Sequence, residues 1–143
     1  MIAKVDDVQK ERAYVADEHK GLLQRLKDDL KVFPTQLDAW AFAAAYAMNK
    51  HEAKEQPPTP RRKEQLPELR VLEAELITVL LESDNYLAST SGWEIITEAR
   101  AATQRLSDWA SLGLSLLSVE WEGRGREQIR RMILQNVSSS LPT

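Results

Sequence analysis

The 143-residue sequence contains no cysteine, which excludes disulfide bonds and zinc sites with thiolate ligands. It has only five glycines, fewer than a turn-rich β fold needs and more typical of long helices. No apolar run approaches the ~18–20 residues that cross a bilayer, and residues 1–7 lack the apolar segment of a secretory signal. We therefore expect a cytoplasmic protein with no membrane partner.

The formal net charge of −3 argues against a protein that coats nucleic acid with a wholly basic surface, although it allows a local basic patch. Hydrophobic residues make up 43% and charged residues 29% of the chain, as in ordinary globular proteins. The length fits one domain, spanning residues 1–143.

The clearest helix in the sequence covers residues 36–50. Thr35 is a suitable N-cap, and Asp38, three residues later, can return a hydrogen bond to it. Apolar residues then recur at helical spacing, and many of them are alanines, which would let another helix approach closely. The sequence therefore places this helix at the centre of the fold.

Four other helices are expected. The first is capped by Asp17 and stopped by Pro34; the next begins near Pro67, buries Val79 and ends at residues 83–85; a long helix covers 93–117; and a short one reaches Val137. Gly113 in the long helix should permit a close helix crossing or mark a bend.

The expected fold class is all-α, a compact five-helix domain. Residues 12–16 alternate weakly and allow one short N-terminal strand, whereas residues 1–11 should be loosely held. A front helical hairpin (12–50) precedes a proline-rich loop (51–65), the back helices (66–137) and a frayed tail (138–143).

Several short motifs resemble one known family. They are Arg-Ala-Tyr-Val-Ala-Asp-Glu at 12–18, Phe-Pro-Thr at 33–35 followed by Asp38, Phe-Ala-Ala-Ala at 42–45, and Ala-Ser-Leu-Gly-Leu at 110–114. The chain thereby resembles the DNA phosphorothioation-associated protein 4 family, small proteins encoded beside bacterial DNA sulfur-modification and anti-phage restriction genes. The resemblance implies a non-enzymatic accessory protein that contacts larger proteins of the same defence system, or DNA. It implies no catalytic residue.

A second interpretation comes from the order of elements in residues 12–50. A strand, a helix, a turn and a second helix also resemble a ribbon-helix-helix unit, in which two chains pair their strands in the major groove of DNA. Arg12 and Tyr14 would then contact bases or phosphates in a homodimer. The alternative is a short edge strand that packs on the helical hairpin.

Two further groups of residues are candidates for partner or DNA contact. Arg124, Arg126, Arg130 and Arg131 could form a phosphate-binding face with residues 61–63, or a solvated helix face balanced by nearby glutamates. Trp121 could lie at a partner interface, where tryptophan is enriched, or pack in the core.

No catalytic, cofactor or metal site is expected. His19 and His51 are the only histidines, and neither has further ligands at the spacing of a metal site. No nucleophile–base pair and no glycine-rich phosphate loop can be named. The leading expectation is therefore a non-enzymatic adaptor, and the alternative is a ribbon-helix-helix-like DNA-binding regulator.

Overall fold

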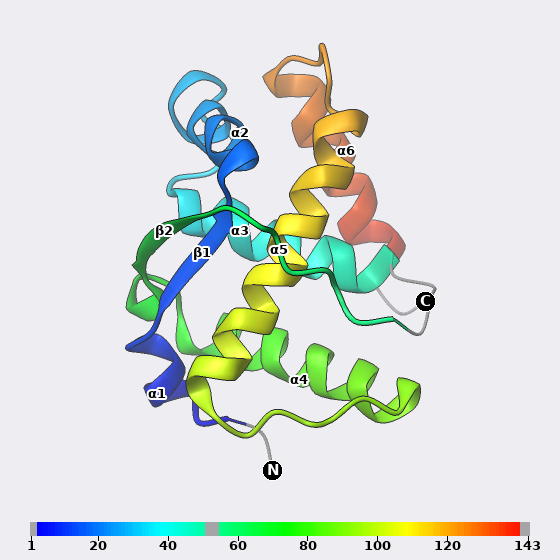
Figure 1. Ribbon diagram of the computed structural model, residues 1–143. Helices are drawn as coiled ribbons and strands as arrows, with labels where there is room; N and C mark the ends of the chain where they lie inside the picture. The colour runs from blue at the N-terminus through cyan, green and yellow to red at the C-terminus, as the bar shows by residue number, and fades with distance from the viewer. Residues whose placement is uncertain (1–2, 51–54, 141–143) are drawn as a thin grey trace.

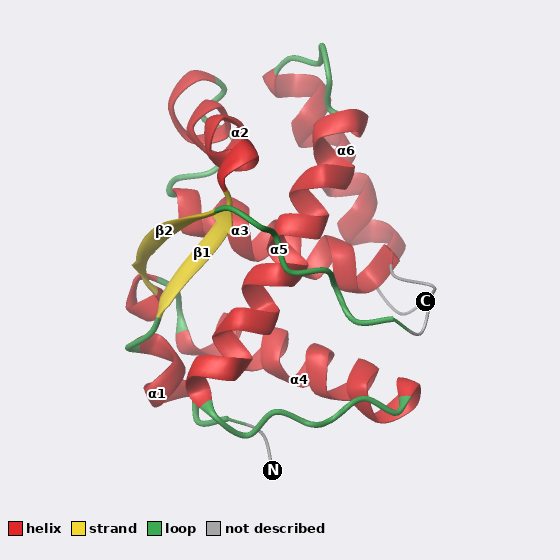
Figure 2. Cartoon of the chain, in the orientation of Figure 1, coloured by secondary structure: helices red, strands yellow, loops and turns green. Residues whose placement is uncertain are grey.

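The computed structural model describes residues 3–50 and 55–140. This part of the chain is mostly helical and adds one two-stranded antiparallel sheet (Figures 1 and 2). Its α-helices are α1 (Val5–Gln9), α2 (Lys20–Gln24), α3 (Gln36–Lys50), α4 (Ala74–Ser91), α5 (Ala99–Glu120) and α6 (Arg126–Ser140). The strands are β1 (Arg12–Ala16) and β2 (Lys63–Glu68). Two short 3-10 helices, η1 (Asp17–His19) and η3 (Leu69–Val71), and one π-helical segment, η2 (Arg25–Asp29), complete the list.

The mostly helical fold is confirmed, but the count of five helices is wrong. Residues 5–9, which were expected to be loosely held, form α1, and Val8 is fully buried in the core. Gln9 Nε2 donates a hydrogen bond of 3.4 Å to the carbonyl of Leu72. Burial of Val8, packing of Val5 on the core and this long-range bond thus hold a segment whose composition alone looked solvated.

Helices α3 and α5 cross at the centre of the fold (Figure 1). The Thr35 cap of α3 is confirmed, because Asp38 N–H donates to Thr35 Oγ1 at 3.1 Å and Thr35 N–H donates to Asp38 Oδ2 at 3.2 Å. At the crossing, a Cβ on Gly113 would lie 1.9 Å from the carbonyl oxygen of Ala43. The close helix crossing expected at Gly113 is therefore confirmed.

Strand β2 corrects the expected boundary between loop and helix. Pro67 lies in this strand instead of opening a helix, and the neighbouring Leu66 is fully buried. The proline-rich loop thus ends before Lys63, and its residues 51–54 lie outside the described part of the chain. The reason is tertiary: β2 pairs with β1, placing Tyr14 opposite Gln65.

Helix α4 starts later and ends later than expected. It continues through residues 83–85 and ends at Ser91, followed by Gly92 as the C-terminal cap, whose φ of 80° suits glycine. Its buried face includes Ile77, Leu80, Leu81, Asp84 and Ala88. Val79 falls outside that face and is 56% exposed, so its expected place in the core is wrong.

Three other helix boundaries also differ. Asp17 opens η1 without capping it, and the first helical run ends at Asp29, before Pro34. Helix α5 begins at Ala99, so Trp93 lies in the loop that precedes it. The side chain of Val137 lies outside the described part of the structure. In the described residues, no helix has the length and apolar character needed to cross a membrane.

Candidate functional site

Both edges of β1 make hydrogen bonds within the same chain. One edge pairs with β2. On the other edge, Ser107 Oγ accepts from Tyr14 N–H at 3.2 Å, and Ser111 Oγ accepts from Ala16 N–H at 3.0 Å. Trp40 Nε1–H donates to the Tyr14 carbonyl at 3.1 Å. A ribbon-helix-helix dimer needs this strand to pair with a second chain, so the observed arrangement argues against that interpretation.

The side chain of Tyr14 points inward and is 9% exposed. Its hydroxyl is hydrogen-bonded to the Asp108 carboxylate and lies 3.1 Å from the Gln104 carbonyl oxygen. Thr59 Oγ1–H donates to the same carboxylate at 2.9 Å. Burial, with the Asp108 carboxylate, raises the pKa of Tyr14 above its usual value. Tyr14 therefore packs the strand on α5 and does not present its ring to a partner.

The carboxyl group of Asp108 has a raised pKa, mainly because it is buried. The hydrogen bonds from Tyr14 and Thr59, and the charge of Lys63, oppose that shift. The Lys63 ammonium lies 4.5 Å from the centre of the Tyr14 ring. These contacts tie β1, β2, α5 and the segment around Thr59 together.

Trp121 is 1% exposed and ends α5. Its ring stacks on Phe42 with 6.0 Å between ring centroids, and Phe42 stacks in turn on Tyr46. Of the two expected places for Trp121, a partner interface or the core, the structure shows the core. Its ring is therefore not available at the surface.

The four arginines expected near the start of α6 are all exposed. They are Arg124, Arg126, Arg130 and Arg131. Arg124 Nε–H donates to the Glu120 carbonyl at 2.8 Å, and Arg130 lies 3.9 Å from Glu127. In Figure 1, α6 and β2 lie on opposite sides of α5. The structure therefore does not gather these arginines with the basic residues 61–63, which lead into and begin β2.

A buried ion pair that the sequence analysis missed joins α4 to α5. Arg105 Nη2 lies 2.8 Å from Asp84 Oδ2, and the two side chains are 7% and 9% exposed. Trp109 Nε1–H donates to Asp84 Oδ1 at 2.9 Å, and Arg105 Nη2 donates to the Glu94 carbonyl at 3.3 Å. The signal for this pair was the position of Asp84, which falls in phase with the buried apolar face of α4.

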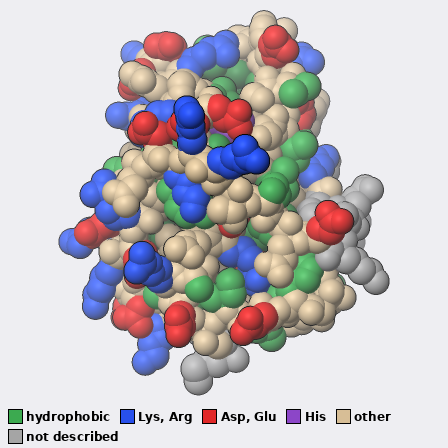
Figure 3. Space-filling model, viewed as in Figure 1, with side chains coloured by type: hydrophobic (Ala, Val, Ile, Leu, Met, Phe, Trp, Pro, Cys, Tyr) green, Lys and Arg blue, Asp and Glu red, His purple; other side chains and the backbone are tan. Residues whose placement is uncertain are grey.

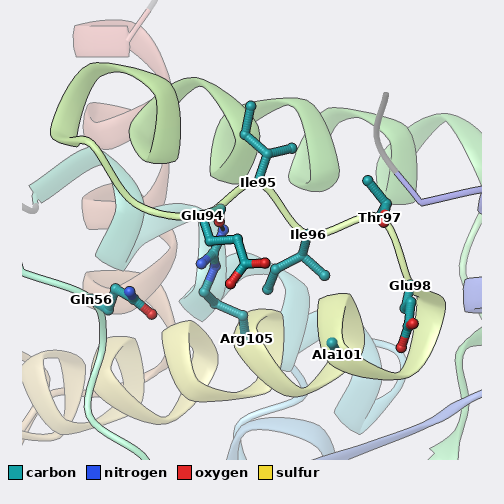
Figure 4. A pocket seen from close by; sticks show the side chains of 8 residues that line it. All are labelled: Gln56, Glu94, Ile95, Ile96, Thr97, Glu98, Ala101 and Arg105. Atoms are coloured by element: carbon teal, nitrogen blue, oxygen red, sulfur yellow. Dashed lines mark hydrogen bonds between the residues drawn. The ribbon is translucent and has the colours of Figure 1, made fainter.

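Arg105 also lies at the inner side of a pocket of about 410 Å³ between α5 and residues 94–98 (Figure 4). Glu94 and Gln56 lie at one end of this pocket, and Glu98 lies at the other. Arg105 already makes a bidentate contact with the Asp84 carboxylate, so an anionic ligand would have to displace this buried carboxylate. The pair is better suited to holding the loop than to binding a ligand.

His19 and Ser115 are the closest approach to a nucleophile–base pair. His19 Nε2 lies 2.8 Å from Ser115 Oγ beside a pocket of about 130 Å³. Ser115 Oγ also lies 3.2 Å from the Ser111 carbonyl oxygen, and the tautomer of His19 decides whether Ser115 O–H donates to that carbonyl or to His19 Nε2. Burial lowers the pKa of His19, against the opposing charge of Glu18. Among the described residues, no three His, Asp or Glu side chains come together as metal ligands would.

A candidate for a binding surface is a groove between α3 and α4 of about 570 Å³, which we call the α4 groove. Val79 is 56% exposed and Tyr86 is 67% exposed. They are seven residues apart on α4, so they lie on the same helix face. The remaining lining includes Ala45, Met48, Asn49, Glu82, Ser83 and Leu87.

The segment that carries the α4 groove differs in charge from the rest of the chain. Residues 71–98 contain six acidic residues and no lysine, arginine or histidine. Only Asp84 is buried among the six; the other five are exposed. Four of the seven exposed large hydrophobic residues of the described chain also belong to this segment, namely Val71, Val79, Tyr86 and Ile95. This segment therefore combines exposed apolar side chains with acidic side chains and contains no basic residue.

Comparisons of the chain with known protein families, with curated proteins and with solved structures find no match.

Proposed function

We propose that this protein is a non-enzymatic adaptor that binds other proteins through the α4 groove. The observation that carries the proposal is the exposure of Val79 and Tyr86 on one face of α4, beside a groove of about 570 Å³. Contiguous exposed apolar side chains with a polar rim are typical of protein interaction sites, and tyrosine is enriched among their energetically important residues.

The charge of the groove suggests the chemistry of the partner. Glu82 lies in the groove, and its helix carries no basic residue to compensate it. A partner segment with apolar side chains and basic flanks would complement both features. The family resemblance adds that such a partner would be a larger protein of a bacterial anti-phage, DNA phosphorothioation-associated system in the cytoplasm.

The buried polar groups support an adaptor more than an enzyme. Asp84 is paired with Arg105, Asp108 accepts hydrogen bonds from Tyr14 and Thr59, and each group therefore stabilises the fold. The ribbon-helix-helix alternative has no comparable support, because β1 makes its hydrogen bonds inside the chain.

The test is affinity capture of the tagged protein from its native host, with nuclease treatment, followed by binding measurements with the purified partner. Val79→Lys should abolish binding. Val71→Lys is the matched control, because Val71 is also 56% exposed but does not line the groove.

The proposal predicts a discrete partner that survives nuclease and that binds the wild type and Val71→Lys with equal affinity. Equal binding of Val79→Lys would show that the groove is not the docking site. Recovery of DNA alone, lost after nuclease, would contradict the adaptor itself. Circular dichroism of each variant checks that its helices remain folded.

A further inference from the structure

A second surface of the molecule carries positive charge. In the view of Figure 3, Lys and Arg side chains gather over the side of the molecule that carries β1 and β2. The chain has a net charge of −3, and residues 71–98 hold six acidic and no basic residues, so the rest of the chain has a net charge of +3. Acidic side chains lie among these cations in the same view.

A pocket of about 420 Å³ lies within this basic side. It receives one cationic side chain from each of three different elements. Lys10 follows α1, Arg12 is the first residue of β1, and Arg100 belongs to the first turn of α5. Residues far apart in sequence thus converge on one hollow, as a binding site for an anion requires.

The side chain of Arg12 is held in place at this pocket. Its Nε–H donates to the Leu66 carbonyl at 3.0 Å across the β1–β2 pair. This bond uses one of the five N–H donors of the guanidinium group and fixes its plane. A guanidinium positioned in this way loses less conformational entropy when an oxyanion binds to it.

The other polar residues of the pocket leave it net positive. Glu68 forms an ion pair with Arg70. Arg70 does not line the pocket, so the negative charge of Glu68 is balanced by a residue outside the lining. The lining thus has three cationic side chains against the two carboxylates of Glu11 and Glu68. The side-chain amides of Gln65 and Gln104 can add neutral donors.

More cations continue along β2 from the pocket. Residues 61–63 are Arg, Arg and Lys, and all three are exposed. They precede Gln65 of the pocket by two to four residues, which corresponds to roughly 7–13 Å of extended chain. An occupant with several phosphates in a row would contact both the pocket and these three residues, whereas a single phosphate would contact only one of them.

We propose that the pocket of Lys10, Arg12 and Arg100 binds a phosphate of a nucleic-acid backbone, and that residues 61–63 bind its neighbouring phosphates. We expect binding to be independent of base sequence, because contacts to phosphates carry no sequence information. The site is separate from the α4 groove and does not depend on it.

Fluorescence anisotropy of the full-length protein with a short labelled DNA duplex tests the proposal. The affinity should fall as salt is raised, to the same extent for unrelated sequences. The Arg12→Ala/Arg100→Ala variant should bind more weakly, and the slope of log K against log salt should be smaller in magnitude by about 2. The Arg12→Lys/Arg100→Lys variant should retain most of that slope.

The matched control is Arg130→Ala/Arg131→Ala, which removes two exposed arginines from α6 and should leave binding unchanged. Loss of binding in this control, but not in Arg12→Ala/Arg100→Ala, would assign the site to α6 and overturn the proposal. Equal affinity for polyglutamate would overturn it by showing no selectivity for phosphate. Tighter binding to phosphoinositide vesicles than to DNA, or no binding of DNA at low salt, would overturn it as well.

Discussion

Gly113 of α5 faces the carbonyl group of Ala43 in α3 so closely that no side chain fits between them. A Cβ placed on Gly113 would lie 1.9 Å from the carbonyl oxygen and 2.6 Å from the carbonyl carbon of Ala43. The atoms that it would meet belong to helix backbone, so they cannot move aside as the end of a side chain can. This contact fixes how closely the two central helices approach.

Gly113→Ala should therefore destabilise the protein, although alanine favours helix. We expect a loss of about 1–3 kcal/mol or more, as for other overpacked cores, because the two helices must separate. Urea denaturation followed by circular dichroism measures the change. Gly21→Ala in α2 is the control: nothing lies within 4 Å of its Cβ, so helix propensity should stabilise it by up to about 1 kcal/mol. Equal effects of the two substitutions would contradict the close crossing.

Arg105→Met should be among the most damaging changes in the chain. It leaves the Asp84 carboxylate buried without its cation, and removal of one partner of a buried ion pair costs about 3–5 kcal/mol. The double variant Asp84→Leu/Arg105→Met should be less destabilised than Arg105→Met, because it leaves no unpaired charge. Thermal denaturation of the two variants makes the comparison, and a double variant that is the less stable of the two would contradict this explanation.

The sequence was sufficient to predict elements that depend on local chemistry. Helix α3 begins after the Thr35 cap and covers the expected residues, because cap and apolar spacing lie within one short segment. The close crossing at Gly113 was also predictable, since a glycine in the middle of a long apolar helix needs a packing reason.

Features that depend on contacts between distant residues were missed. Pro67 looked like the start of a helix, and only its pairing with β1 makes it part of a strand. Asp84 looked like the end of a helix, and its burial depends on Arg105 and Trp109, which are 21 and 25 residues away. Of the candidate site residues, Tyr14 and Trp121 proved buried, because long-range packing decides whether an aromatic ring faces inward.

The serines of α5 should stabilise β1 through its backbone. Ser107→Ala removes the acceptor for Tyr14 N–H, and Ser111→Ala removes the acceptor for Ala16 N–H. A buried N–H without a partner costs about 1–3 kcal/mol, so each variant should lose stability in that range. Ser118→Ala is the control, because its exposed hydroxyl bonds only to the Ser115 carbonyl within the helix.

Hydrogen exchange at the same two amides gives an independent measurement. Each serine variant should speed exchange at its own amide more than at the other one. If both amides remained equally protected in Ser107→Ala and Ser111→Ala, these serines would not be the acceptors that hold β1.

The contribution of His19 to the stability of the protein should fall as the pH drops below about 6.5. Burial lowers the pKa of this histidine in the folded protein, whereas in the unfolded chain it stays near 6.5. Between the two values the unfolded chain binds a proton that the folded protein does not, so stability rises with pH through this window and is lost as pH falls. Urea midpoints of the wild type, measured from pH 7.5 to 5.5 and compared with those of a variant without this histidine, should show the decline.

Substitution of His19 isolates its share of this dependence. His19→Gln keeps a side chain that can hydrogen-bond to Ser115 but cannot take up a proton, so the stability contributed by this position should no longer vary with pH. Other groups titrate in the same way in both proteins, including Asp108, whose raised pKa contributes with the opposite sign above pH 3.8. The difference between the two profiles of urea midpoint against pH therefore reports His19 alone. Parallel profiles would show that burial of His19 does not make the stability depend on pH in this range.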